Sequence, residues 1–152
     1  MEAWKSLKNL EPMELKGFLY EKMLEILTKN IRIRVKISEN SIVHHSEIED
    51  LVRILGIFID NAIEEVQGCS SGKMEIKIVK KEKGILFEVR NTYCQMPDIN
   101  RMGREQYSSK GDGRGNGLLW VEKYLEKRED LFHELKIEGD EIVQRLEIYK
   151  IN

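Results

Sequence analysis

The stretch SSKGDGRGNGLLWVEKYLEK, residues 108–127, places four glycines at every second position directly before a helical pattern. They are Gly111, Gly113, Gly115 and Gly117. Glycine loses more backbone freedom on folding than any other residue, so such a run needs a physical reason. Backbone without Cβ atoms, followed by a helix start, exposes N–H donors and the positive end of the helix dipole, which suits phosphate groups. The alternative is a flexible loop that is merely rich in glycine.

Two common phosphate-binding patterns do not fit this stretch. The P-loop sequence GxxxxGK[ST] is absent from the chain. The dinucleotide-binding pattern GxGxxG fails because Leu118 stands where the third glycine should follow Gly113 and Gly115, and no strand leads into it. What is left is GxGxGxGL running into a helix.

The composition indicates one globular domain. The chain has 152 residues, of which 41% are hydrophobic and 34% charged, enough to bury a core without cross-links. The net charge of −2 argues against a nucleic-acid-binding protein. Cys69 and Cys94 match no metal or redox spacing, which predicts reduced thiols in a cytosolic protein. The apolar run at residues 54–59 is too short to cross a membrane, and no secretory signal is visible, so we expect a soluble chain.

Hydrophobic periodicity predicts the order of helices and strands. The expected elements are a helix over residues 12–30, a strand over 31–38, a polar turn over 39–45, a long helix ending near 66, a hairpin of strands 74–81 and 85–91, a helix over 118–129, and two closing strands over 133–139 and 142–150. Ser46 and Glu49 form a capping box before the long helix. Residues 92–116 show no period, which is typical of a lid or binding loop. Helices segregated from a largely antiparallel sheet indicate a two-layer α+β sandwich.

The long helix carries a second unusual feature, LGIFIDNAIEEV at residues 55–66. Asp60 and Asn61 interrupt an otherwise apolar segment. A buried amide without a hydrogen-bond partner costs roughly 1–3 kcal/mol, so Asn61 must bond to something. Its side-chain oxygen is the kind of ligand that Mg²⁺ prefers, alongside substrate phosphates. The alternative is a partly exposed position that bonds to water.

Three ordered motifs together resemble the GHKL ATP-binding fold, also called the Bergerat fold. They are DNAIEE on a helix, a hairpin ending in VRN, and a lid closing with SSKGDGRGNGL, and the resemblance covers roughly residues 12–150. This superfamily comprises sensor histidine kinases, gyrase-type topoisomerases, mismatch-repair ATPases and a family of heat-shock chaperones. The motifs look most like the peptide-sensing Agr-receptor class of Gram-positive histidine kinases, whose helix reads LG..LDNAIE and whose lid closes on KGxGRGxGL.

The resemblance implies an architecture and a set of site residues. We expect a mixed, mostly antiparallel sheet covered on one face by about three helices, a catalytic domain over residues 12–152 with a lid over about 92–116, and a linker over residues 1–11. Asn61 would be catalytic by holding Mg²⁺ against the ATP phosphates. Asn91 stands where most relatives have an aspartate that accepts from the adenine amino group, and the glycines that normally follow it are replaced. The other implied nucleotide-binding residues are Glu65, Lys110, Gly111, Gly113, Arg114, Gly115, Asn116, Gly117 and Leu118. Lys110 and Arg114 are candidate phosphate cations, or else solvated charges.

Ile57 indicates which reaction to expect. It lies one helical turn before Asn61, so the two residues share a face. In the ATP-hydrolysing relatives, and in the similar anti-sigma-factor serine kinases, a glutamate at this position acts as the base. Isoleucine cannot accept a proton, whereas a neutral imidazole is nucleophilic near pH 7 without a base. The resemblance therefore favours phosphoryl transfer to histidine, with catalysis by positioning and charge stabilisation.

The chain's own histidines, His44, His45 and His133, do not fit the phosphoacceptor of this family, which lies on upstream dimerisation helices. The resemblance thus implies a catalytic fragment, monomeric by itself, on the cytoplasmic face of a membrane receptor used in quorum sensing. Its partners would be the dimerisation domain of the same receptor and a response regulator. Three alternatives stay open: a degenerate ATP-binding regulatory module, supported by Asn91 and the missing glycines; an anti-sigma-factor-type serine kinase, which Ile57 disfavours; and an interaction domain that binds no nucleotide.

Overall fold

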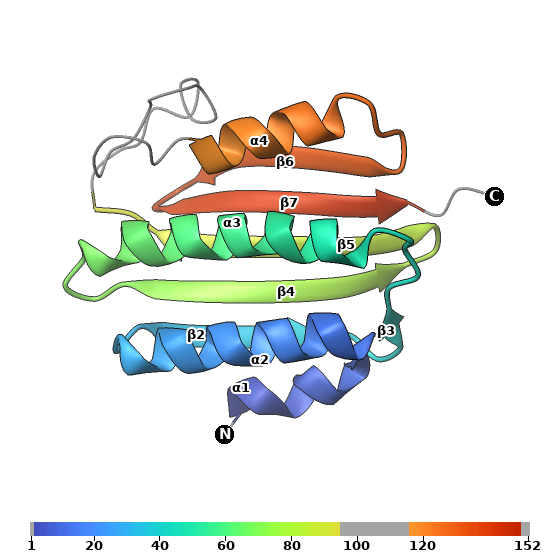
Figure 1. Ribbon diagram of the computed structural model, residues 1–152. Coiled ribbons are helices and arrows are strands. Elements are labelled where there is room, and N and C mark those ends of the chain that lie inside the picture. The colour runs from blue at the N-terminus through green and yellow to red at the C-terminus, as the bar shows by residue number, and fades with distance from the viewer. Residues whose placement is uncertain (1, 95–115, 150–152) are drawn as a thin grey trace.

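The computed structural model describes residues 2–94 and 116–149 of the chain. Three longer helices cover one face of a five-stranded sheet, so the predicted α+β two-layer class is confirmed (Figure 1). The elements are α1 (Glu2–Lys5), the 3₁₀ helix η1 (Ser6–Asn9), β1 (Leu10–Glu11), α2 (Met13–Thr28), β2 (Arg32–Ile37), β3 (Ser41–Ile42), α3 (Ile48–Gln67), β4 (Lys73–Lys81), β5 (Gly84–Thr92), α4 (Asn116–Leu125), β6 (Leu131–Glu138) and β7 (Glu141–Tyr149). None of the described helices is both long enough and apolar enough to cross a membrane.

The strand order in the large sheet is β2-β4-β5-β7-β6. β2 pairs parallel with β4, because α3 carries the chain back between them, and every other neighbouring pair is antiparallel. The predicted β4–β5 hairpin is confirmed, with Gly84 at its turn. A Cβ built on Gly84 would lie 1.9 Å from the carbonyl oxygen of Ile148 in β7. Glycine is required here because the two backbones approach so closely.

α3 is the central helix of the core. Its apolar face, which includes Phe58 and Ile54, is fully buried against the sheet. Phe58 stacks on His133 of β6 with ring centroids 4.9 Å apart. On the other side, Gly56 brings α3 close to Phe18 of α2. The hydrophobic periodicity of 3.6 residues predicted for this helix is confirmed, since the apolar residues form the face that packs against the rest of the core.

Residues 2–11, which the sequence assigns to a linker, pack along the edge of β2. Leu7 and Leu10 are buried in the core. The Ser6 hydroxyl accepts a hydrogen bond from the Ile37 backbone N–H at 3.1 Å, and the Asn9 amide donates to the Ile37 carbonyl at 2.8 Å. The segment therefore covers part of an edge strand whose backbone groups would otherwise face solvent.

The face of the sheet opposite the helices carries a charge network centred on Glu88. This side chain is only 3% exposed, and its two oxygens accept from Arg90 Nε at 2.9 Å and from Arg145 Nε at 2.6 Å. Burial alone would raise the pKa of the Glu88 carboxyl, but the hydrogen bonds from the two arginines outweigh it and lower the pKa. Arg90 also contacts Glu138, and Arg145 contacts Glu134. The network ties β5, β6 and β7 together on the uncovered side.

The start of α3 differs from the prediction. The capping box of Ser46 and Glu49 is wrong: the helix begins at Ile48, Glu47 is the N-cap residue, and it makes no side-chain capping bond. The Glu47 backbone N–H instead donates to His45 Nδ1 at 3.0 Å. The Glu47 carboxylate is engaged elsewhere, because Tyr124 and Arg128 both donate to it. The N-cap side chain is thus bound by Tyr124 of α4 and by Arg128 after it.

His45, Glu47, Tyr124, Arg128 and Asp130 form what we call the α3–α4 clasp. Asp130 accepts from Arg128 Nε and Nη2, both at 3.1 Å, and lies 2.7 Å from His45 Nε2. These hydrogen bonds, from Arg128 above all, lower the pKa of Asp130 to about 2. α4 ends at Leu125, four residues before the predicted end, and Arg128 lies in the following turn. The clasp fixes α4 and β6 against the beginning of α3.

The clasp predicts a pH dependence of stability. The pKa of Asp130 is about 2 in the folded protein, against about 3.9 for an unperturbed aspartate in the unfolded chain. Its contribution to the free energy of unfolding is therefore present above about pH 4 and lost as the pH falls toward 2. We expect Asp130→Asn to lower stability at pH 7, and the wild-type advantage to shrink between pH 4 and pH 2. Urea denaturation across this range measures the difference.

Glu129→Gln is the matched control for Asp130→Asn, since Glu129 is the exposed neighbouring carboxylate. This variant should follow the wild-type stability curve at every pH. A constant gap between Asp130→Asn and wild type from pH 7 to pH 2 would contradict the assignment, because a carboxyl with a lowered pKa must lose its advantage on protonation.

Candidate functional site

The predicted site residues that the structure describes meet at one end of the molecule. The end of α3, the end of β5 and the start of α4 lie together there (Figure 1). α3 carries Asn61 and Glu65, β5 carries Asn91, and α4 begins at Asn116. Gly117 and Leu118 follow in the first turn of α4. Outside the described residues lie Lys110, Gly111, Gly113, Arg114, Gly115 and most of the predicted lid, together with the side chain of Asn116.

One face of α3 carries the site. Ile57, Asn61 and Glu65 follow one another at four-residue intervals on α3, and Cys69 follows four residues later, two residues beyond the end of the helix. Each is partly exposed, and we call these four residues the α3 stripe. Such spacing places side chains above one another along one side of a helix. A Cβ built on Gly117 would lie 3.1 Å from Cγ2 of Ile57, so a glycine lets the start of α4 approach the stripe. Leu118, buried beside it, anchors this end of α4 in the core.

Asn61 holds a buried polar group without a protein partner. Within the described part of the chain, its amide nitrogen Nδ2 is the buried side-chain atom that lacks a hydrogen bond. Folded proteins satisfy most such groups, and leaving one unpaired costs roughly 1–3 kcal/mol. An aliphatic residue would avoid that cost at this position. The amide is therefore available to a group that does not belong to the described chain.

Asn61 also fits the predicted magnesium ion. Mg²⁺ is usually held by one or two protein oxygens together with phosphate oxygens and water, and an amide oxygen is such a ligand. No group of three or more histidine, cysteine, aspartate or glutamate side chains suited to a metal occurs among the described residues. At Asn61 one protein oxygen would leave the other Mg²⁺ positions to phosphate oxygens and water.

Asp60, the neighbour of Asn61 in the sequence, has a different role. Its carboxylate lies 2.6 Å from Nζ of Lys22 on α2. Partial burial would lower the pKa of Lys22, but the hydrogen bond to Asp60 outweighs it and raises the pKa. Asp60 therefore joins α3 to α2 on one flank, whereas Asn61 lies on the flank that approaches α4. The two adjacent residues of the motif therefore have different roles: Asp60 is structural, and Asn61 is a candidate ligand-binding residue.

Asn91 lies on the helix-facing side of β5, between Met74 of β4 and Ile142 of β7. It is only 3% exposed, and its Nδ2 donates to the Thr92 carbonyl at 3.0 Å. One of its two N–H donors is thus used within the chain, and its carbonyl oxygen is the acceptor that it can offer to a ligand. An acceptor is what the predicted adenine contact requires.

The residues that replace the expected glycines after Asn91 are each fastened. The Thr92 hydroxyl accepts from the Lys73 backbone N–H at 3.1 Å, which ties the end of β5 to the start of β4. The Tyr93 hydroxyl donates to the Gly139 carbonyl at 3.0 Å, in the β6–β7 turn. Side chains therefore hold this segment, where the resemblance led us to expect glycines.

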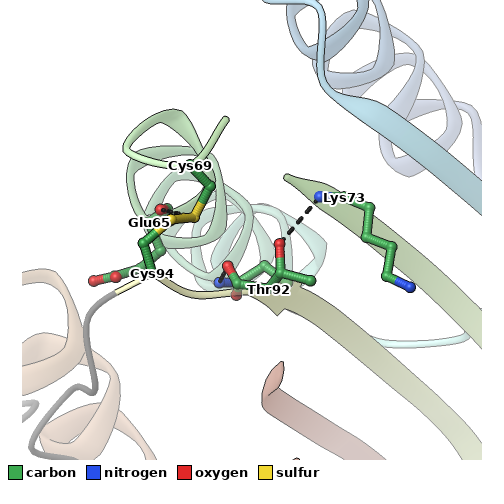
Figure 2. Close-up of a disulfide and its surroundings, with 6 residues drawn as sticks. Glu65, Cys69, Lys73, Thr92 and Cys94 are labelled. Carbon is green, nitrogen blue, oxygen red and sulfur yellow. Dashed lines mark hydrogen bonds between the residues drawn. A yellow bond between two sulfur atoms is a disulfide. The ribbon is translucent and has the colours of Figure 1, made fainter. Parts of the chain in front are cut away.

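Cys94 bonds to Cys69, and Figure 2 shows this disulfide between the end of α3 and the segment after β5. The Cα atoms are 5.6 Å apart, although 25 residues separate the cysteines in sequence. The prediction of two reduced thiols is wrong for this structure. Sequence spacing could not reveal the pair, because only the β4–β5 hairpin returns the chain to the end of α3.

Two of the three histidines have partners that hold them in the fold. His45 belongs to the α3–α4 clasp. His133 stacks on Phe58, and its Nε2 lies 3.3 Å from the Gln144 side-chain oxygen. Burial lowers the pKa of His133, which keeps the imidazole neutral at pH 7. Both are structural residues in this arrangement.

Comparisons with known proteins agree with this fold. The family model described as the GHKL domain matches residues 46–149. The nucleotide-free catalytic domain of histidine kinase ThkA superposes with a TM-score of 0.73 at 17% identity, covering 97% of this chain and 95% of that one. The complex of ThkA with the response regulator TrrA gives 0.71 at 16%, covering 91% and 40%. Full-length ShkA in complex with AMPPNP gives 0.68 at 20%, covering 91% and 30%.

At these identities the solved structures share the fold with the chain, and no curated protein matches its sequence. The family model covers well over half of the 152 residues and includes α3, β5 and α4, the three elements that carry Asn61, Asn91 and Gly117. The chain belongs to the GHKL domain family.

Proposed function

We propose that the chain is the ATP-binding catalytic domain of a two-component sensor histidine kinase. The observation that carries this proposal is the buried, unpartnered amide of Asn61 at the place where α3, β5 and α4 of a GHKL domain meet. Asn61 would hold Mg²⁺, and Asn91 would accept from the adenine amino group. The first turn of α4 offers backbone N–H groups to the phosphates, with Gly117 leaving its backbone bare. Glu65 and the predicted residues between Lys110 and Asn116 complete the proposed site.

The reaction is transfer of the γ-phosphoryl group of ATP to a histidine on a separate dimerisation domain. The bond from the γ-phosphorus to the bridging oxygen breaks, a bond to an imidazole nitrogen forms, and ADP leaves. Bound Mg²⁺ supplies charge neutralisation at the phosphates. The chain's own residues bind and orient ATP, and Ile57 presents no base that could activate water. A neutral imidazole acceptor does not need one.

The finer parts of the proposal concern the intact receptor. The dimerisation helices and the response regulator would be its protein partners, and the domain would work on the cytoplasmic face of a membrane receptor. The motifs favour the peptide-sensing Agr-receptor class and a role in quorum sensing. The structure of ThkA with a response regulator supports the choice of partner class.

A phosphotransfer assay tests the proposal. The chain is mixed with the separately produced dimerisation helices of its receptor and ATP labelled at the γ-phosphate. We expect label on a histidine of the helices, lost in acid and stable in base, and absent when that histidine is replaced by glutamine. Acid-stable label on a serine would favour the serine-kinase alternative. Binding of Mg-ATP without any transfer would favour the regulatory module. The hydrogen bonds of Thr92 and Tyr93, which hold the segment after Asn91, support that alternative.

A substitution at Ile57 tests the choice of acceptor. Ile57→Glu would place a carboxylate one turn from Asn61, and we expect slow ATP hydrolysis, roughly ten-fold above wild type. Phosphate release measures the rate. Ile57→Gln is the matched control, because it has the same size without a base. Equal rates for the two variants would show that the missing base is not what prevents hydrolysis.

A further inference from the structure

We propose that Cys69 and Cys94 form a redox-controlled tether that regulates nucleotide affinity. In the disulfide form the tether would weaken binding of Mg-ATP, and its reduction would restore binding. The inference rests on the proposed function, since it concerns the same site. Beyond that function, it assigns a modification site, the Cys69–Cys94 pair. It also assigns a regulatory signal, the thiol–disulfide redox state of the protein's surroundings.

The position of Cys69 is the first argument. Cys69 lies two residues beyond the end of α3, eight residues after Asn61 and four after Glu65. The helix from Asn61 to its end at Gln67 is roughly 9 Å long, so the disulfide at that end lies within the reach of an extended ligand bound at Asn61. Its partner, Cys94, is three residues beyond Asn91. The bond therefore joins the two chain segments that carry the proposed metal and adenine contacts (Figure 2).

The spacing at the disulfide gives the direction of the effect. A flat ring held between two chain segments needs a van der Waals contact of about 3.5–4 Å on each face, or about 7 Å in all. The two Cα atoms are held 5.6 Å apart. The bond thus holds the end of α3 and the segment after β5 together at this point, and it opposes the separation that a nucleobase entering between them would require.

The disulfide is also the contact that reduction can remove. The Thr92 and Tyr93 hydrogen bonds fasten the segment to β4 and to the β6–β7 turn, and neither involves α3. The bond from Cys94 to Cys69 is the fastening to α3 described for this segment. Its reduction would leave β5 in place and release Cys94 from the α3 stripe. The fold is kept while the spacing at the site becomes adjustable.

The exposure of the two sulfurs suits thiol–disulfide exchange. Cys94 is exposed and Cys69 is partly buried, so an incoming thiolate attacks Cys94 Sγ. The S–S bond breaks, Cys69 leaves as a thiolate and takes up a proton, and the second thiol of a dithiol reductant then releases Cys94. The reductant departs as its own disulfide, and a disulfide oxidant drives the reverse reaction. Cys69 Sγ lies 3.8 Å from the Glu65 carbonyl oxygen, which can accept from the reduced thiol.

The test compares the affinity for Mg-ATP of the same chain in two states. One sample is reduced with dithiothreitol and the other is oxidised with oxidised glutathione, and both are then freed of reagent. Mass spectrometry after alkylation should find two alkyl groups on the reduced chain and none on the oxidised chain. Calorimetric titration should give roughly ten-fold weaker binding for the oxidised chain, within the usual range of such coupling.

Cys94→Ser and Cys69→Ser are the matched controls. Both should bind like the reduced wild type under either treatment, and two variants guard against a folding defect in one. Equal affinity of the two wild-type states, or tighter binding when oxidised, would overturn the tether while leaving the proposed function intact. A chain that never protects its two thiols would also overturn it. Absence of binding in every sample would refute the proposed function and the tether together.

Discussion

Replacing Asn61 with alanine is expected to lower the affinity for Mg-ATP at least a hundred-fold, or about 3 kcal/mol, without destabilising the domain. The amide oxygen is the protein ligand proposed for Mg²⁺, and alanine offers none. The amide nitrogen is buried without a described partner, so its removal leaves no protein group unsatisfied. The free energy of unfolding should therefore stay equal to that of wild type or rise. Calorimetric titration with and without Mg²⁺, together with urea denaturation, measures both effects.

Asp60→Ala is the matched control for Asn61→Ala. The two residues are adjacent in sequence, but Asp60 pairs with Lys22 and is 53% exposed, so its loss should leave nucleotide binding unchanged. Asn61→Asp should keep part of the Mg²⁺-dependent affinity, because a carboxylate oxygen also ligates this ion. Wild-type affinity in Asn61→Ala would refute the metal assignment. Clear destabilisation of Asn61→Ala would show instead that the amide has a structural partner.

The pair of effects expected at Asn61 is characteristic of a functional residue. An unpaired buried polar group lowers the stability of the fold. Its presence indicates an interaction with a ligand that the folded chain alone does not make. The contrast with Asp60 strengthens the case, since that neighbour has its partner within the chain.

Replacing Glu88 with alanine is expected to lower the free energy of unfolding by about 2 kcal/mol. Glu88 is almost completely buried and accepts from both Arg90 and Arg145. Without it the two guanidinium groups lie next to each other without the carboxylate between them. Each keeps another acidic contact, at Glu138 and at Glu134, which limits the loss. Urea denaturation at pH 7 measures the change.

Glu134→Ala is the matched control, because this carboxylate contacts the same Arg145 but is 43% exposed. Exposed ion pairs contribute little, so the control should lose less than about 1 kcal/mol. Equal losses for Glu88→Ala and Glu134→Ala would contradict the view that burial sets the energy. High salt should narrow the difference between Glu134→Ala and wild type more than that between Glu88→Ala and wild type.

The sequence predicted the three longer helices and the five strands of the large sheet, because each depends on a local pattern. It missed four short elements, and the predicted polar turn over residues 39–45 contains β3, which pairs with β1. The alternation at residues 31–38 and the apolar periodicity of residues 48–67 both report a face that packing covers, and β2 and α3 confirm them. The motifs also led to the GHKL family, which the family model shows. The ligands of the site stay a prediction, and several of its residues lie outside the described part of the chain.

Predictions that required a partner were less successful. The cap at Ser46 is a local pattern, but α3 begins at Ile48 with Glu47 as its N-cap residue, and the Glu47 carboxylate binds Arg128 and Tyr124. No prediction from the sequence concerned Glu88, which is buried and accepts from two arginines, Arg90 on its own strand and Arg145 on β7. The alternation of apolar and polar residues along one strand does not show which side chains of the neighbouring strands lie beside it.

The sequence by itself determined the order of the three longer helices and of the five strands in the large sheet, the two-layer class and the face of α3 that carries Asn61, because periodicity and motif spacing are properties of contiguous residues. Tertiary structure alone decided that Asp60 turns to Lys22 while Asn61 is left without a partner, and that Cys94 meets Cys69. These outcomes depend on which groups the fold brings within a few ångströms across 25 or more residues of chain. Hydrogen bonds and disulfides form only over such short distances, so the folded chain selects them.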